Sequence, residues 1–465
     1  MFNHQPATAI KTSEAAAVIL LLLSGISYGM IKLELVPHIP VLLGIGALIV
    51  YGLIKKIKMA DLENSMIEGA KAGLGAVMIF FFIGMLVSSW IAAGTIPTLI
   101  YLAFEMVSGK WFYGIVFVVT SIIGLSIGSS LTTSAVIGVA FIAVSETLGL
   151  SSAITAGAVV SGAFLGDKMS PLSDTTVLAS STVKVDLFDH IKNMAWTTIP
   201  AFLISLILFA GMSPELGSAD FTKLEGLQNA LVGMNLVHWF SLIPLMVLAV
   251  LAVKKVSSIL TLGAGTLSAM AISLFVVEKQ QWGSLPGILY SGYKSQSGNQ
   301  QLDSLLSRGG MESMFFSVSL VLLALSMGGL LFKLGVLPAL LQGLAGSLKR
   351  VPVLIGSAAL SAVGINFLIG EQYLSILLTG NTFAGHFEKA GLHPKNLSRV
   401  LEDAGTVINP LVPWSVCGVF LSGVLGVNTV EYVPFAFFCL LSPLLTLTAG
   451  FTGITVTRIG RKAVA

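Results

Sequence analysis

No Asp, Glu, Lys or Arg occurs between residues 111 and 145, and the centre of this stretch reads Gly124-Leu-Ser-Ile-Gly128-Ser-Ser-Leu-Thr-Thr133. A membrane helix needs about 20 mostly apolar residues, so the stretch is long for one crossing and short for two. Its central residues break helices or form hydrogen bonds to the backbone. We therefore expect a helical hairpin over residues 111–147 that enters the membrane and returns on the same side.

A second apolar stretch has the same character. Residues 351–387 are interrupted by Gly364-Ile-Asn366-Phe-Leu-Ile-Gly370-Glu371-Gln372. Non-helical backbone at membrane depth is tolerated only where it is buried in protein or lines a water-filled cavity. The sequence thus predicts a second re-entrant hairpin over 351–387, and the tips of both hairpins should face an interior site.

The composition places the whole chain in a membrane. Of its 465 residues 55% are apolar and only 10% are charged, against about 45–50% and 25% in soluble domains. This excludes a soluble enzyme, a disordered protein and a secreted disulfide scaffold. Cys417 and Cys439 lie in apolar stretches and are interpreted as buried thiols. The predicted class is an all-α polytopic membrane protein.

The two halves of the chain share a series of landmarks. Gly94-Thr-Ile-Pro97 resembles Gly335-Val-Leu-Pro338, Ile127-Gly128 matches Ile369-Gly370, and Gly166-Asp167 corresponds to Glu402-Asp403. Landmarks in the same order at a nearly constant offset indicate an internal repeat, although glycine and proline are common in membrane helices.

The repeat predicts a layout for each half. Each would hold two helices, an amphipathic link, a third helix, a hairpin, a broken helix and a last helix. We expect a first repeat over 1–225, with hairpin 111–147 and broken helix 151–180. The second repeat would cover 226–465, with hairpin 351–387 and broken helix 395–425. Five crossings in each half give about ten transmembrane helices and invert the second repeat.

Basic residues favour one orientation of this layout. With the N-terminus in the cytoplasm, most Lys and Arg residues stand at cytoplasmic ends, among them Lys55, Lys56, Lys184 and Lys192. This follows the positive-inside rule and places both termini in the cytoplasm. Hairpins that crossed completely would leave the same loops inside, so the charges do not decide whether the hairpins are re-entrant.

The densest polar stretch within the apolar chain is Gly166-Asp167-Lys168-Met169-Ser170-Pro171-Leu172-Ser173-Asp174-Thr175-Thr176. Pro171 lacks a backbone donor and leaves upstream carbonyl groups free. Carboxylates, hydroxyls and free carbonyls are the oxygen ligands that a hard cation prefers. We expect an unwound helix that binds a cation here. The alternative is a solvated polar loop at the membrane surface.

The corresponding stretch of the second half is Glu402-Asp403-Ala-Gly405-Thr406-Val-Ile-Asn409-Pro410-Leu-Val-Pro413-Trp414. Two prolines break this helix, and a simple helix cap would also explain its two acids. Glu371 has mostly apolar neighbours, so we expect a buried carboxyl group suited to proton coupling. Its alternative is a helix-end acid at the membrane surface.

Together these breaks and hairpin tips define the candidate site. The predicted ion-binding and substrate-binding residues are Ser129, Ser130, Thr132, Thr133, Asp167, Ser170, Ser173, Asp174, Thr175, Asn366, Glu371, Gln372, Asp403, Thr406 and Asn409. No Walker-type glycine loop and no nucleophile–base spacing is present in the sequence. We therefore expect neither an enzyme nor a bound cofactor.

The first hairpin tip, Gly128-Ser-Ser-Leu-Thr-Thr-Ser134, and the stretch 166–176 resemble the NhaC-type sodium/proton antiporters. Their wider superfamily of ion transporters includes arsenite, citrate and dicarboxylate carriers. The resemblance implies a bacterial plasma-membrane transporter that exchanges Na⁺ for H⁺. It also implies a homodimer with a scaffold region and a mobile transport region that moves like an elevator. The matching motif holds Asp167, Ser170, Ser173, Asp174 and Thr175.

The candidate Na⁺ ligands are Asp167 and Asp174, which stand in the matching motif, and Glu371 and Asp403, which rest on our own interpretation. The resemblance leaves the substrate open, because NhaC-like proteins include malate/Na⁺-lactate exchangers and amino-acid transporters. Few intramembrane cations are present to neutralise an organic anion, namely Lys168, Lys333 and Arg399, which favours simple cation exchange. An ion channel is the alternative from another class.

Overall fold

The computed structural model describes residues 7–106, 110–215, 226, 228–254, 256–277, 279–298, 302–303, 306–345 and 350–459. In these ranges the regular structure is helical, apart from an isolated antiparallel bridge between Leu392 and Arg458. The expected all-α class is confirmed.

The helices of the first half end at the breaks where glycine, proline and capping residues stand. They are α1 (Thr12–Ile31), α2 (His38–Ile54), α3 (Met59–Ala72), α4 (Leu74–Ala92), α5 (Thr95–Met106), α6 (Phe112–Ile127), α7 (Ser130–Thr133), the π-helix η1 (Ser134–Gly138), α8 (Val139–Thr147), α9 (Ser152–Met169), α10 (Asp174–Thr182) and α11 (Leu187–Met212).

The second half has a similar order of elements. They are η2 (Trp239–Leu242), α13 (Ile243–Val253), α14 (Ser258–Val276), η3 (Lys279–Ser284), α15 (Leu285–Ser291), η4 (Glu312–Met314), α17 (Phe315–Lys333), α18 (Val336–Ala345), α19 (Val351–Ile369), α20 (Gln372–Lys389), α21 (Lys395–Val400), the π-helix η5 (Leu401–Thr406), η6 (Asn409–Leu411), α22 (Val416–Leu425), α23 (Thr429–Tyr432), η7 (Val433–Phe435) and α24 (Phe437–Thr452).

Within the described ranges, seven helices are long and apolar enough to cross a membrane, or up to nine if each of two bent helix pairs counts as one crossing. Two of the seven, Ser130–Thr147 and Val351–Ile369, are arms of the expected hairpins. Of the shorter apolar helices, α2 and Trp239–Val253 stand where crossings were expected, whereas α6 is a further hairpin arm, so the number of ten crossings stays a prediction. A polytopic membrane protein is thus confirmed, whereas re-entrance stays a prediction.

Some of the expectations fall on other parts of the chain. Residues 216–225, which precede the expected boundary between the repeats, lie outside the described residues, and so do residues 1–6 and 460–465. The domain boundary and the sides of the two termini therefore stay predictions.

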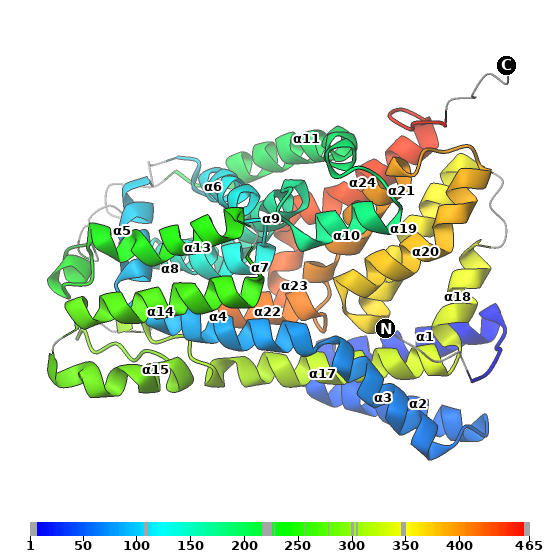
Figure 1. The fold of residues 1–465 in the computed structure, drawn as a ribbon, viewed down its shortest axis with the longest axis horizontal. Helices are drawn as coiled ribbons and strands as arrows, with labels where there is room; N and C mark the ends of the chain where they lie inside the picture. Colours follow the sequence, from blue (N-terminus) through cyan, green and yellow to red (C-terminus); the bar gives the residue numbers. More distant parts are fainter. Residues whose placement is uncertain are drawn as a thin grey trace.

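The two halves pack against each other reciprocally (Figure 1). Helix α4 of the first half packs along α14 of the second, and α17 of the second half packs along α2 and α3 of the first. Because α2 and α14, like α4 and α17, hold the same places in the two series, each contact has a counterpart with the halves exchanged.

Both hairpin tips use the same local device. Gly128 and Gly370 end α6 and α19 in the left-handed region, with φ of +71° and +75°, where a side chain would be strained. The next residue, Ser129 or Glu371, caps the following helix with its side chain. At both tips a capping side chain thus satisfies a backbone N–H at the start of the following helix.

Glycines bring the first hairpin against the broken helix of its own half. A Cβ atom on Gly162 would lie 2.6 Å from the carbonyl oxygen of Phe117, and one on Gly124 would lie 3.1 Å from the carbonyl oxygen of Ala163. Helices α6 and α9 thus touch backbone to backbone, as small residues permit in membrane proteins.

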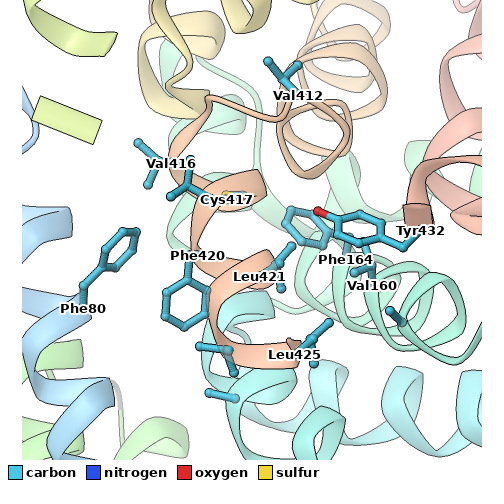
Figure 2. Close-up of a cluster of buried hydrophobic side chains, with 14 of the residues drawn as sticks. Phe80, Val160, Phe164, Val412, Val416, Cys417, Phe420, Leu421, Leu425 and Tyr432 are labelled. Carbon is cyan, nitrogen blue, oxygen red and sulfur yellow. The ribbon is translucent and has the colours of Figure 1, made fainter. Parts of the chain in front are cut away.

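Helix α22 occupies the middle of the apolar core, between α4 and α9 (Figure 2). Phe420 points towards Phe80 of α4, with 4.9 Å between ring centroids. On the other side Phe164 of α9 and Tyr432 of α23 approach Leu421. The hydroxyl of Tyr432 donates to the carbonyl oxygen of Pro410 at 2.6 Å, which satisfies its only polar atom in this core.

The Gly162→Ala substitution should destabilise the protein by about 1–3 kcal/mol, because the added methyl group must separate α6 from α9. Gly46→Ala is the matched control, since nothing lies within 4 Å of a Cβ atom at that exposed position. The midpoint of thermal unfolding in detergent measures both. Equal midpoints for the two variants would contradict the close contact.

Candidate functional site

A cavity of about 490 Å³ lies where the first hairpin tip meets the break between α9 and α10. Its polar or charged lining residues are Ser129, Ser130, Thr132, Asp167, Ser173, Asp174, Thr175, Ser257, Ser258, Thr261, Gln372 and Tyr373. This volume exceeds that of a bare metal ion and lies in the range of small-molecule sites.

Asp167 is held at the wall of the cavity by the hairpin tip. Its Oδ2 accepts a hydrogen bond from the Ser130 hydroxyl at 2.7 Å and another from the Ser130 backbone N–H at 3.1 Å. The Ser130 N–H is one of the free donors at the start of α7. The 5% exposed carboxylate is therefore anchored on one side and faces the cavity on the other.

The break after α9 supplies further polar lining residues of the cavity. Helix α9 ends at Met169, and α10 begins at Asp174 with Ser173 as its cap. The Ser173 hydroxyl lies 3.0 Å from that of Thr175. The expected unwound helix is observed between Met169 and Asp174.

The opposite wall of the cavity was not predicted. Ser257 precedes α14, and Ser258 and Thr261 form its first turns. Tyr373 enters from the start of α20. These residues stand at the ends of apolar helices about 80 to 200 positions from Asp174, so only their packing against the first half reveals them.

Glu371 is buried, as expected, with 6% of its surface exposed, but the cavity is lined by its neighbours Gln372 and Tyr373. Its Oε2 accepts a hydrogen bond from the Leu374 N–H at 2.7 Å. In this state Glu371 is thus a helix-capping carboxylate inside the protein, which combines parts of both sequence interpretations.

The amides expected to bind ligand in the second half are bonded to the protein. The Asn409 side chain donates to Asn366 Oδ1 at 2.7 Å and accepts from the Cys417 N–H at 2.9 Å. Asn366 in turn donates to the Gly405 carbonyl oxygen at 2.6 Å. These side chains bind the second hairpin tip to the second broken helix, and the corresponding half of the site is closed.

Asp403 lies in a separate buried cluster. Its carboxylate forms an ion pair with Lys168, and both side chains are completely buried. Its other oxygen accepts hydrogen bonds from Thr446 and, at 2.8 Å, from Thr197. Lys168 is completely buried and Asp167 is only 5% exposed, so the alternative of a solvated Asp167–Lys168 loop is wrong. Asp403 is neutralised by Lys168 in this state and does not face the cavity.

The three intramembrane cations considered for an organic anion are placed elsewhere. Lys168 is paired with Asp403. Arg399 donates to the Thr455 hydroxyl at 3.0 Å. Lys333 ends α17 beside a small surface pocket with Asp61. None of them lines the cavity, where the charged residues of the described ranges are Asp167 and Asp174.

The structure therefore divides the predicted site. The cavity gathers Ser129, Ser130, Thr132, Asp167, Ser173, Asp174, Thr175 and Gln372. It does not gather Thr133, Ser170, Asn366, Glu371, Asp403, Thr406 and Asn409, which are buried around it. What any of these residues binds stays a prediction.

The donor set of the cavity suits a hard monovalent cation. Within the described residues there is no group of three or more His, Cys, Asp or Glu side chains placed to hold a metal ion. Two carboxylates among many hydroxyls instead give charge attraction with weak, exchangeable oxygen ligands.

Comparisons with known proteins support a transporter. The profile of the "Na+/H+ antiporter family" matches residues 6–186 and 162–454. The Na⁺/H⁺ antiporter NhaC of Alkalihalophilus pseudofirmus is 39% identical over 427 residues, which covers 92% of each chain.

Two further relatives carry other names. The arginine/ornithine antiporter ArcD of Halobacterium salinarum is 36% identical, covering 92% of this chain and 89% of the relative. The malate-2H⁺/Na⁺-lactate antiporter of Bacillus subtilis is 35% identical over 84% of each chain. Proteins similar to this chain thus include transporters of different cargo.

The Lys168→Met substitution should destabilise the protein by about 3–5 kcal/mol, because it leaves the Asp403 carboxylate buried without its counter-charge. The double variant Lys168→Met/Asp403→Asn should recover most of the loss, since no buried charge is then left unpaired. Chemical unfolding in detergent of the two single variants and the double variant measures this coupling. If the losses of the single variants simply add, the ion pair does not stabilise the fold.

Proposed function

Because the chain belongs to the Na⁺/H⁺ antiporter family, we propose that it is a secondary transporter that exchanges Na⁺ for H⁺ across the bacterial plasma membrane. The observation that carries this proposal is the cavity of about 490 Å³ whose charged lining, among the described residues, consists of Asp167 and Asp174. Such a cavity attracts cations and repels carboxylates.

The same observation separates this proposal from the exchange of an organic acid. A dicarboxylate would need positive charge or several free donors at its binding site. Lys168 and Arg399 are bonded within the protein and lie outside the cavity. The cavity has room for an organic cation, so transport of an amino-bearing substrate remains a second candidate, favoured by the cavity volume.

Exchange follows from competition for one carboxylate. Asp167 binds Na⁺ when ionised and releases it when it takes up a proton, so the two ions occupy the site in turn. Ser130 keeps the Asp167 carboxylate in one orientation through two hydrogen bonds. Hydroxyls of Ser129, Ser173 and Thr175 supply further oxygen ligands from the same cavity.

Alternation between the two sides follows from the repeat. We propose that the halves are inverted repeats, that the cavity is open to the cytoplasm in this state, and that the outward state opens the second hairpin tip instead. The cavity reaches Val256 and Ser257, which follow Lys254 at the end of α13, and the layout predicted from the sequence places this end on the cytoplasmic side. Hairpins and broken helices would form the moving transport region of a homodimer, and α13 and α14 part of its scaffold.

Addition of Na⁺ should dissipate a pH gradient in proteoliposomes of the purified protein with no organic substrate present. The same assay is repeated with malate, lactate, arginine or ornithine, each added alone and together with Na⁺. Turnover only in the presence of an organic acid would refute plain cation exchange, and flux that fails to saturate would indicate a channel.

The Asp167→Asn variant should reduce Na⁺-dependent proton movement to the rate of protein-free liposomes, because the amide can neither ionise nor hold Na⁺ by charge. Asp189→Asn is the matched control, since Asp189 is exposed in the first turn of α11. Fluorescence of a pH-sensitive dye inside the liposomes measures both. Normal exchange by Asp167→Asn would remove this residue from the site.

A further inference from the structure

Among the buried acids of the described residues that do not line the cavity, Glu402 differs from Glu371 and Asp403 in its contacts. Glu402 has no exposed surface, and neither carboxyl oxygen has a hydrogen-bond partner. Other buried carboxylates in the described ranges are satisfied: Asp403 by Lys168, Asp167 by Ser130, and Glu371 by the Leu374 N–H. An unpartnered buried carboxylate is costly, so a group of this kind either holds a proton or, when ionised, binds a cation.

The surroundings of Glu402 cannot neutralise it. The charged groups that act on it are Asp167 and Lys168 from α9 and Asp403 from its own helix. Lys168 is already engaged by Asp403. The guanidinium of Arg399, one turn earlier on the chain, donates to Thr455. The groups that act on Glu402 are two acids and one lysine, so their summed charge is negative when Asp167 is ionised, which favours a cation.

The backbone at Glu402 is also unusual. Leu401–Thr406 is a π-helix, in which the Val407 N–H donates to the Glu402 carbonyl oxygen at 3.3 Å. Single π-helical turns are rare and occur often at functional sites. The hydroxyl of Thr406, one turn after Glu402, is buried and acts on the Glu402 carboxyl group, but it forms no hydrogen bond of normal geometry. Two neighbouring oxygen-bearing side chains thus have no hydrogen-bond partner outside this turn.

We propose that Glu402 and Thr406 form a second Na⁺ site, separate from the cavity site at Asp167. Carboxylate and hydroxyl oxygens are ligands that Na⁺ accepts as a hard cation. Helix η5 packs against α9 and α10, the two helices that flank the cavity break. The charge of a cation bound at Glu402 would therefore act on the Asp167 carboxyl group. This inference rests on the proposed Na⁺/H⁺ exchange and adds a second ion to it.

Equilibrium binding of ²²Na⁺ to the purified protein at alkaline pH tests the proposal directly, without transport. The wild-type protein should bind two Na⁺ per chain, and Glu402→Gln and Asp167→Asn should each bind one. Thr406→Val should keep both sites and weaken one of them by about tenfold, the equivalent of roughly 1.4 kcal/mol. Glu388→Gln, at an exposed position of α20, is the matched control and should bind two.

Loss of folding is separated from loss of a site by the thermal midpoint without Na⁺. Glu402→Gln removes an unpartnered buried carboxyl group, so its midpoint should equal or exceed that of the wild type, whereas the stabilisation by added Na⁺ should decrease. Equal binding by Glu402→Gln and the wild type overturns the second site alone. No binding by the wild type would instead refute the proposed function.

Discussion

A charge inside a membrane protein must be matched by another group, and the ion pair between Lys168 and Asp403 meets this constraint at the centre of the molecule. Lys168 belongs to the broken helix of the first half and Asp403 to that of the second. The pair joins the two breaks and neutralises both charges. Lys168 and Asp167 are adjacent in α9, and adjacent residues of a helix face different directions. Because Lys168 points to Asp403, it lies away from the cavity. Asp167 is thereby left to face the cavity.

The two halves share their elements but differ in state. At the first hairpin tip, Asp167, Asp174 and the surrounding hydroxyls line an open cavity. At the second, Asn366 and Asn409 bond to each other and to backbone groups of the break. The turns at Gly128 and Gly370 nevertheless have similar φ angles, and each is followed by a residue whose side chain caps the next helix. A common local design in two different packing states is the property expected of an inverted repeat that opens alternately.

The local features of the site were accessible from the sequence because they depend on nearest neighbours. Gly128 and Gly370 predicted the hairpin tips, and Pro171 with its flanking hydroxyls predicted the unwound segment before Asp174. The roles of individual acids were less accessible. The sequence around Asp403 predicts an ion ligand, because its partner Lys168 lies 235 positions away and the pairing is not visible in the sequence. The sequence around Glu402 is compatible with a helix cap. Its lack of a hydrogen-bond partner becomes apparent only when the neighbouring helices are placed.

The sequence by itself determined the membrane class, the helix breaks and the first half of the site, because hydropathy and backbone preferences act over a few residues. Tertiary structure alone decided which charges are paired and which remain open to an ion. It brought Ser257, Thr261 and Tyr373 to the far wall of the cavity, closed Asn366 and Asn409 against each other, and matched Lys168 with Asp403. Electrostatic pairing in a low-dielectric interior depends on distances between helices, and these are set only when the two halves pack.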